Sequence, residues 1–109
     1  STIAEAIGMM LPRGASHPAD YKAGSDIHAD VRAQAKASVD ALYALMAANI
    51  RPRDIMTEKA FENAIVAASA LGASTNCPPH VNAIARHIGV KLENKDWDKV
   101  GYDIPLLVN

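Results

Sequence analysis

The sequence predicts a mainly α-helical fold of about four to five helices, with a helical hairpin over residues 57–89 and a short strand at the C-terminal end. Three observations support this fold class. Apolar residues recur at helical spacing in residues 25–49, 57–71 and 76–88. Residues that favour helix starts and stops stand at the borders of these segments. Only residues 104–108 run in the way that a buried strand does.

The first expected element is a short helix within residues 1–10. Thr2 and Glu5 stand at the spacing of a capping box, and Ile3, Ile7 and Met10 share one helical face. Residues 11–22 contain two prolines and a glycine, and they are expected to form a loop. His17 lies in this loop, where a histidine is more often solvated than functional.

A long helix is expected from Ser25 or Asp26 to about Asn49. One apolar stripe runs along it, formed by Ile27, Val31, Ala35, Val39, Leu42, Leu45 and Met46. Such a stripe predicts a face turned toward the core, with the charged face in solvent. His28 stands near the helix start beside Asp26 and Asp30, whose charges favour its protonated form.

The helical hairpin follows Arg51-Pro52-Arg53-Asp54, which is expected to break the long helix. Thr57 is a good N-cap, and Gly72 is placed to end the first hairpin helix in the left-handed conformation. The second half of that helix is apolar on nearly every side, which predicts burial. Asn76 is expected to cap the second helix, and Gly89 to end it. The expected core residues are Phe61, Ala64, Ile65, Ala68, Leu71, Val81, Ile84, Ala85 and Ile88.

The last expected helix covers residues 95–100, with Asn94 as its cap and Trp97 and Val100 facing inward. The apolar run 104–108 then predicts a buried strand. A single strand has nothing to pair with, and the first helix also lacks an evident partner. We therefore expect this chain to be one segment of a larger protein.

Composition excludes several classes of function. The 109 residues carry a net charge of −1, which supplies no basic field for nucleic acid or anionic membrane. One cysteine excludes an internal disulfide and an all-cysteine metal site within this chain. There is neither a membrane-spanning run nor a signal-peptide pattern, so the expected compartment is the cytoplasm.

The turn between the hairpin helices supplies the candidate substrate-pocket residues Gly72, Ser74, Thr75 and Asn76. A polar turn that enters a helix N-terminus is suited to a carboxylate or phosphate. Pro78 and Pro79 carry no N–H group, so the hydroxyls and the amide must supply more of the donors. A simple cap and turn explains the same residues.

A metal site is an alternative use of the second hairpin helix. Cys77, His80 and His87 stand at spacings that place all three on one side of a helix, and a thiolate with two imidazoles can bind zinc. The spacing does not match a known closed zinc site. A buried cysteine with two hydrogen-bonded histidines is the simpler interpretation, and no metal ligand is assigned.

Four stretches carry a family pattern: AEAIGMMLPRGASHPA, AFENAIVAASALGASTN, HVNAIARHIGVKL and DWDKVGYDIPLLVN. In this order they resemble the dihydroxy-acid dehydratase and 6-phosphogluconate dehydratase family. The resemblance covers nearly the whole chain and is weakest across residues 21–49. Its most specific part is Phe61-Glu62-Asn63-Ala64 followed by Gly72-x-Ser74-Thr75-Asn76. HVNAIARHIGV and IPLLVN resemble the sugar-acid (aldonate) members more closely than the branched-chain amino acid enzyme.

The resemblance implies that residues 1–109 are an internal segment of the N-terminal domain of a larger dehydratase, whose domain is α/β. Such a hydro-lyase converts a 2,3-dihydroxy acid, here a sugar acid, to a 2-keto acid. In this family an iron–sulfur cluster and a divalent cation (Mg²⁺) act on the leaving hydroxyl, and a serine takes the C2 proton. These groups fall outside this segment, so no catalytic residue or bound cofactor is expected on it. Only the turn 72–76 is carried over, as active-site wall, and Cys77-Pro78-Pro79 departs from the family pattern beside it.

The competing hypothesis is a free-standing helical module that covers its apolar faces with a partner and performs no catalysis. As a dehydratase segment, the chain is expected to contact the remainder of its polypeptide or a second copy. An open reading frame that continues on both sides with cysteine-containing motifs upstream would separate the two hypotheses in favour of the enzyme.

Overall fold

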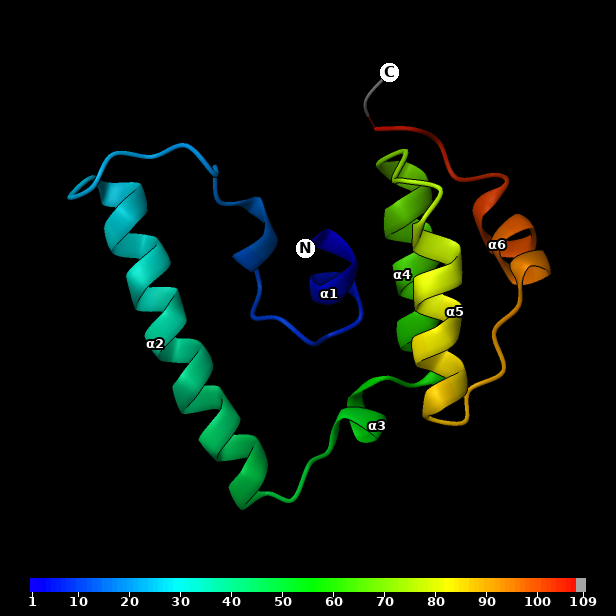
Figure 1. Ribbon diagram of the computed structural model, residues 1–109, viewed down its shortest axis with the longest axis horizontal. Helices are drawn as coiled ribbons and strands as arrows, with labels where there is room; N and C mark the ends of the chain where they lie inside the picture. The colour runs from blue at the N-terminus through cyan, green and yellow to red at the C-terminus, as the bar shows by residue number, and fades with distance from the viewer. Residues whose placement is uncertain (108–109) are drawn as a thin grey trace.

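The computed structural model describes residues 1–107, and these residues form helices joined by turns and loops (Figure 1). The order is α1 (Thr2–Ala6), the 3-10 helix η1 (Gly14–Ser16), α2 (Asp26–Ala47), α3 (Pro52–Ile55), α4 (Glu58–Ala70), α5 (Cys77–His87) and α6 (Asn94–Gly101). The mainly α prediction is confirmed. There is one helix more than expected because the Arg51–Asp54 break itself forms a helical turn, α3.

The core is organised around α4, which packs against α1, α5 and α6. Phe61 and Ile65 of α4 are almost completely buried, and Ala64 beside them has no exposed surface. Ile7, Val81, Ala85 and Leu92 complete this cluster from the other segments. We call α1, α4, α5 and α6 together the helical body. Its small aliphatic side chains let α4 and its neighbours approach closely, as the alanine-rich sequence predicts.

The hairpin prediction is confirmed at its ends. The Thr57 hydroxyl accepts a hydrogen bond from the N–H of Ala60 at 3.3 Å and caps α4. Gly72 and Gly89 have φ of +59° and +86°, the left-handed conformation that ends each helix. Burial of α4 on nearly every side was wrong, since Val66 and Leu71 are 38% and 43% exposed. The helices α1, α5 and α6 cover one face of α4 and leave the other face open.

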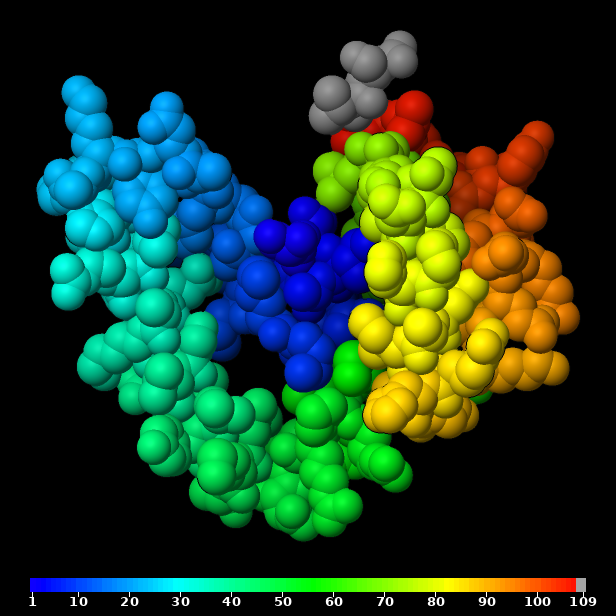
Figure 2. Space-filling view, viewed as in Figure 1, coloured from blue at the N-terminus to red at the C-terminus, as the bar shows by residue number. Residues whose placement is uncertain are grey.

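The long helix is present, but its apolar stripe is not part of the core. α2 covers nearly the predicted residues, and the Ser25 hydroxyl caps it by accepting from the N–H of His28 at 3.2 Å. No residue of α2 is buried. Figures 1 and 2 show why: α2 stands apart from the α4–α5 pair, with α1 and the loop after it between them. The prediction that this stripe faces the core was therefore wrong for residues 1–107, where only Val31 and Leu45 of the stripe are half-buried.

Two predicted caps were wrong because tertiary contacts take the side chains. The Glu5 carboxylate does not close a capping box on α1 but accepts hydrogen bonds from the N–H groups of Arg13 and Ala15. The Asn94 side chain accepts from the amide of Asn82 at 2.9 Å, and α6 is instead preceded by Glu93, whose N–H donates to Asp96. Trp97 and Val100 of α6 pack against the core as expected.

The predicted C-terminal strand is also wrong over the described residues 104–107. Leu106 and Leu107 are 57% and 73% exposed, and residues 104–107 form no strand. A single hydrogen bond, from the N–H of Leu107 to the carbonyl oxygen of Ala70 at 2.8 Å, ties it to the end of α4. Val108 lies outside the described residues. Within residues 1–107, no helix is both long and apolar enough to cross a bilayer.

Candidate functional site

The turn between α4 and α5 has the conformation that its glycine predicts. The N–H of Gly72 donates to the carbonyl of Ser69 at 3.1 Å, and the N–H of Ala73 donates to that of Ala68 at 2.9 Å. These two bonds satisfy the last carbonyls of α4 and direct the chain away from the helix axis. Residues 72–76 are therefore held in a fixed path although all five are exposed.

Asn76 does not cap α5 through its side chain, so this prediction was wrong. Its backbone is helical, with φ −75° and ψ −15°, and its side chain makes no capping hydrogen bond. Ser74 takes the role instead: its hydroxyl accepts from the N–H of Asn76 at 3.2 Å, and its carbonyl accepts from the N–H of Cys77 at 2.9 Å. A serine two residues earlier closes the turn locally, which leaves the Asn76 amide free of that role.

The turn borders a pocket of about 240 Å³, which is lined by Ala68, Ser69, Gly72, Ala73, Ser74, Thr75, Cys77, Pro78 and Trp97. The structure thus brings Gly72, Ser74 and Thr75 together on one wall, while Asn76 lies outside it. The volume is smaller than the roughly 300–1,000 Å³ typical of small-molecule sites. One wall of the pocket is made by the turn, and Trp97 of α6 lines it from another segment.

Hydrogen-bond donors in this pocket are few. Pro78 and Pro79 have no N–H group, and the N–H groups of Asn76 and Cys77 are already bonded to Ser74. Recognition of an anion or a sugar hydroxyl at this wall would depend on the Ser74 and Thr75 hydroxyls. This agrees with the sequence-based expectation that the prolines weaken the helix terminus as an anion site.

A larger hollow of about 710 Å³ was not predicted from the sequence. It lies where α3 meets α5 and is lined by Arg51, Pro52, Arg53, Met56, Ala83, Ile84, His87 and Ile88. The two arginines form no ion pair among residues 1–107. The only sequence signal was the Arg-Pro-Arg tripeptide, which was interpreted as a helix break. The hollow is far larger than the turn pocket, but it shares no residue with it.

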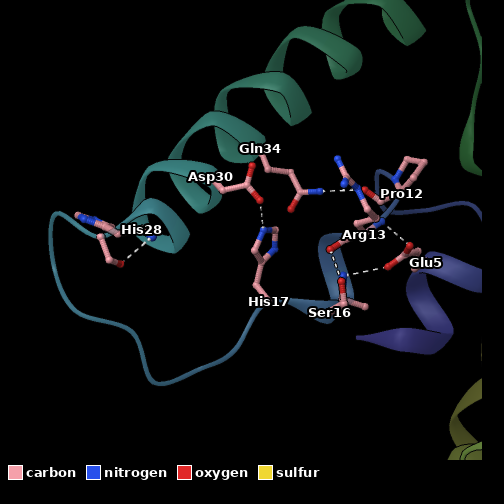
Figure 3. Close-up of polar contacts among 10 residues, drawn as sticks. Glu5, Pro12, Arg13, Ser16, His17, His28, Asp30 and Gln34 are labelled. Atoms are coloured by element: carbon pink, nitrogen blue, oxygen red, sulfur yellow. Dashed lines mark hydrogen bonds and ion pairs between the residues drawn. The ribbon is translucent and has the colours of Figure 1, made fainter.

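Polar contacts also fix the loop between α1 and α2 (Figure 3). His17 is not solvated as expected: its side chain is 18% exposed, and Nε2 lies 2.7 Å from Oδ2 of Asp30. The Gln34 amide donates to the carbonyl of Pro12 at 3.1 Å. His28 does not pair with the neighbouring aspartates, because its Nδ1 accepts from the N–H of Gly24 at 2.7 Å and its ring stacks on Tyr21. These contacts position the loop and show no catalytic arrangement.

Comparison with known proteins identifies the family. A family model described as "Dihydroxy-acid/6-phosphogluconate dehydratase N-terminal" matches residues 1–109. This chain belongs to that dehydratase family. The match covers the turn 72–76 and the other three stretches on which the sequence resemblance depends, and it confirms that resemblance.

Three curated relatives illustrate the range of the dehydratase family. D-xylonate dehydratase of Caulobacter vibrioides is 40% identical over 109 residues, all of this chain and 17% of the relative. Dihydroxy-acid dehydratase 2 of Staphylococcus saprophyticus is 45% identical over 105 residues, 96% of this chain and 17% of the relative. L-arabinonate dehydratase of Rhizobium leguminosarum is 40% identical over 106 residues, 97% of this chain and 17% of the relative. The chain thus spans about one sixth of these dehydratases.

The iron–sulfur cluster and divalent cation implied by the dehydratase resemblance do not fit the residues of this segment. In the described part of the chain, no three His, Cys, Asp or Glu side chains are arranged to hold a metal ion. Cys77 lines the turn pocket and His87 lines the arginine hollow, so the zinc alternative with His80 is not supported either. We assign no reaction step through a metal group to these residues.

Proposed function

We propose that this chain is part of a dehydratase that removes water from a 2,3-dihydroxy sugar acid to give a 2-keto acid. The observation that carries the proposal is the family match over all 109 residues. The three relatives described above are named dehydratases, and two of them act, by name, on sugar acids. The family match favours this function over the free-standing helical module.

The chemistry explains why this segment would supply a wall and not the reacting groups. Hydroxide is a poor leaving group and the C2 proton is weakly acidic, so dehydration needs a Lewis acid and a base. We place the iron–sulfur cluster, the Mg²⁺ ion and the base on parts of the longer enzyme outside residues 1–109. The cytoplasm is the proposed compartment.

Within that enzyme, Gly72, Ser74 and Thr75 are proposed to line the substrate pocket. Gly72 keeps the turn in its left-handed path, and Ser74 and Thr75 bring two of the hydroxyl groups that line the pocket, the third being that of Ser69. Both hydroxyls can donate to a carboxylate or to a sugar hydroxyl. Ser74 is also needed for the turn itself, so Thr75 is the cleaner residue to test.

The activity is tested with the full-length gene product, purified without oxygen and mixed with xylonate, arabinonate and a branched 2,3-dihydroxy acid. The expected result is formation of a 2-keto acid, detected as its semicarbazone, with a sugar acid as the preferred substrate. Identities of 40%, 45% and 40% do not separate the sugar-acid relatives from the dihydroxy-acid relative. A preference for the branched acid would correct the substrate class, and no turnover of any acid would overturn the function.

The role of the turn is tested with Thr75→Val, which removes the hydroxyl at nearly constant shape. We expect KM for the preferred acid to rise about 10-fold or more, since one hydrogen bond to the substrate is lost. Thr75→Ser should recover most of the loss. Ser38→Ala, on the exposed surface of α2, is the control. An unchanged KM in Thr75→Val would show that residue 75 only shapes the turn.

A further inference from the structure

The second half of α2 carries an exposed apolar ridge. Val39, Leu42, Tyr43 and Met46 are 52%, 55%, 68% and 65% exposed. They stand at positions i, i+3, i+4 and i+7 of a regular helix and therefore share one face. We refer to these four residues as the α2 ridge. Isolated apolar residues on a surface need no explanation, but four on one helical face form a continuous patch.

The rest of the described chain supports α2 from a different side. Val31, Gln34, Ala41 and Leu45 are half-buried, and they fall on the adjoining face of the helix. On that side Leu45 and Ala41 line an apolar groove of about 590 Å³ together with Met10 and Ile55. Two hydrogen bonds, between His17 and Asp30 and between Gln34 and Pro12, also join α2 to the loop before it. Only Leu42 of the ridge borders this groove, so most of the ridge has no cover among residues 1–107.

The chain exposes more surface area to solvent than a compact domain of its mass. A compact monomer of 11.6 kDa is expected to expose about 5,800 Å². The chain exposes 7975 Å², and its radius of gyration of 15.6 Å exceeds the roughly 13 Å expected for a compact domain of this length. The excess of about 2,100 Å² is larger than the roughly 800 Å² per partner of a standard protein interface. This excess belongs to the whole chain, and the α2 ridge is one of the surfaces that contribute to it.

The chemistry beside the ridge defines the surface that fits it. The nearest charged residues on α2, Lys36 and Asp40, pair with each other at 2.9 Å and leave no net charge. The surface that covers the ridge therefore needs no charged group to match this part of α2. An uncharged aliphatic surface, such as a helix laid along the ridge, is the chemical match.

We propose that the α2 ridge is covered by an aliphatic surface from another part of the same polypeptide in the longer dehydratase. The inference rests on the proposed function for the existence of that longer enzyme. Its second basis is independent of function: curated relatives are about six times as long as this chain, and the missing cover has the size of an internal contact. A second copy of the chain is the competing occupant.

Hydroxyl-radical footprinting of the wild-type full-length protein is the first test, because it needs no variant and does not measure catalysis. Tyr43 and Met46 are readily oxidised wherever solvent reaches them. We expect their oxidation rates in the native protein to be at least 5-fold lower than in the same protein unfolded in urea, at every protein concentration tested. Native rates within 2-fold of the unfolded rates would overturn the proposal. Protection that disappears on dilution, with a halved mass, would assign the ridge to a second copy and also overturn it.

Val39→Asp in the full-length protein is the second test, with Ala37→Asp on the opposite face of α2 as the matched control. Val39 is 52% exposed and does not line the groove, so its substitution disturbs no contact within residues 1–107. We expect Val39→Asp to lower Tm by about 3 °C or more and Ala37→Asp by about 1 °C or less. Equal shifts would contradict the proposal. If Val39→Asp does not fold while Ala37→Asp does, the ridge is required for folding and the proposal is supported. If the wild-type full-length protein shows no dehydratase activity, this result contradicts the proposed function but not the proposal for the α2 ridge.

Discussion

Asn82 shows how a single buried polar residue organises the contact between α5 and α6. It is 8% exposed, its amide donates to Asn94, and its carbonyl accepts from the Trp97 indole N–H at 2.8 Å. No buried side-chain polar atom in the described residues lacks a partner. This network was not predicted, because helical periodicity places residue 82 beside the apolar stripe without indicating which polar group will meet it.

We predict that Asn82→Ala destabilises the protein by about 1–3 kcal/mol, because it leaves the buried indole N–H without an acceptor. Urea unfolding followed by Trp97 fluorescence measures the change. Asn63→Ala, at an exposed position of α4, should change the free energy of unfolding by less than about 0.5 kcal/mol. Equal losses in the two variants would show that the Asn82 network contributes nothing specific.

Glu5 gives a prediction about pH. The backbone N–H groups of Ala15 and Arg13 hydrogen-bond to its carboxylate and lower its pKa from the ordinary value of 4.5. A carboxyl group whose pKa is lowered by folding adds stability above its unfolded pKa, and this stability is lost as the pH falls through the folded pKa. Tm of the wild-type protein should therefore fall more steeply below pH 4.5 than Tm of Glu5→Gln.

The control for this measurement is Asp20→Asn, at an exposed loop position outside the Glu5 contacts. Its Tm should follow the wild-type curve. Parallel curves for wild type and Glu5→Gln would mean that the Glu5 hydrogen bonds do not stabilise the loop.

The helices α2 and α4 differ in what their N-terminal caps stabilise. α4 is capped by Thr57 and supplies most of the core, whereas α2 is capped by Ser25 and buries no residue. Thr57→Ala should lower the free energy of global unfolding by about 1 kcal/mol. Ser25→Ala should mainly raise the rate of local opening of α2, which few tertiary contacts oppose.

Amide hydrogen exchange distinguishes these effects. In Ser25→Ala, we expect faster exchange in residues 26–47 and little change in α4. In Thr57→Ala, the slowest exchanging amides of α4 should lose protection together. Loss of protection throughout the molecule in Ser25→Ala would show that α2 and α4 unfold as one unit.

The elements that were predicted correctly are those specified by local chemistry. Helix periodicity, the Thr57 cap and the glycine at position 72 act within a few residues, so they can be recognised without a fold. The predictions for Glu5, Asn94 and the strand over residues 104–107 failed because tertiary contacts, or the lack of them, decided the outcome. The Asn76 cap failed for a local reason, since Ser74 closes the turn. A strand in particular needs a neighbouring strand, which the described residues do not contain.

The candidate site shows the same difference between local and tertiary determinants. Gly72, Ser74, Thr75 and Asn76 were predicted as pocket residues because they lie in one turn, and the first three of them line the turn pocket. Trp97, which lines the same pocket, and the arginine hollow were missed because each joins segments far apart in the sequence. Sequence reasoning can therefore point to residues that share one turn, but not to the residues that folding brings beside them.

For the whole molecule, we predict that the 109-residue polypeptide alone turns over no sugar acid and binds no stoichiometric iron. The reason is its donor set: one cysteine, with no cluster of three metal-binding side chains in residues 1–107. Reconstitution with iron and sulfide followed by metal analysis and visible absorbance is the measurement. Iron near one or two atoms per chain, with a charge-transfer band, would contradict the prediction.

The described chain measures 45 × 40 × 18 Å, and its smallest dimension is less than two helix diameters. In so thin a layer, many helical side chains lie at the surface, and no residue of α2 is buried. A deep mutational scan of the short polypeptide and one of the complete enzyme should therefore disagree most at positions facing outward from the layer, where tolerance in the first becomes intolerance in the second. Consensus and stability engineering of this region should accordingly be guided by the complete enzyme.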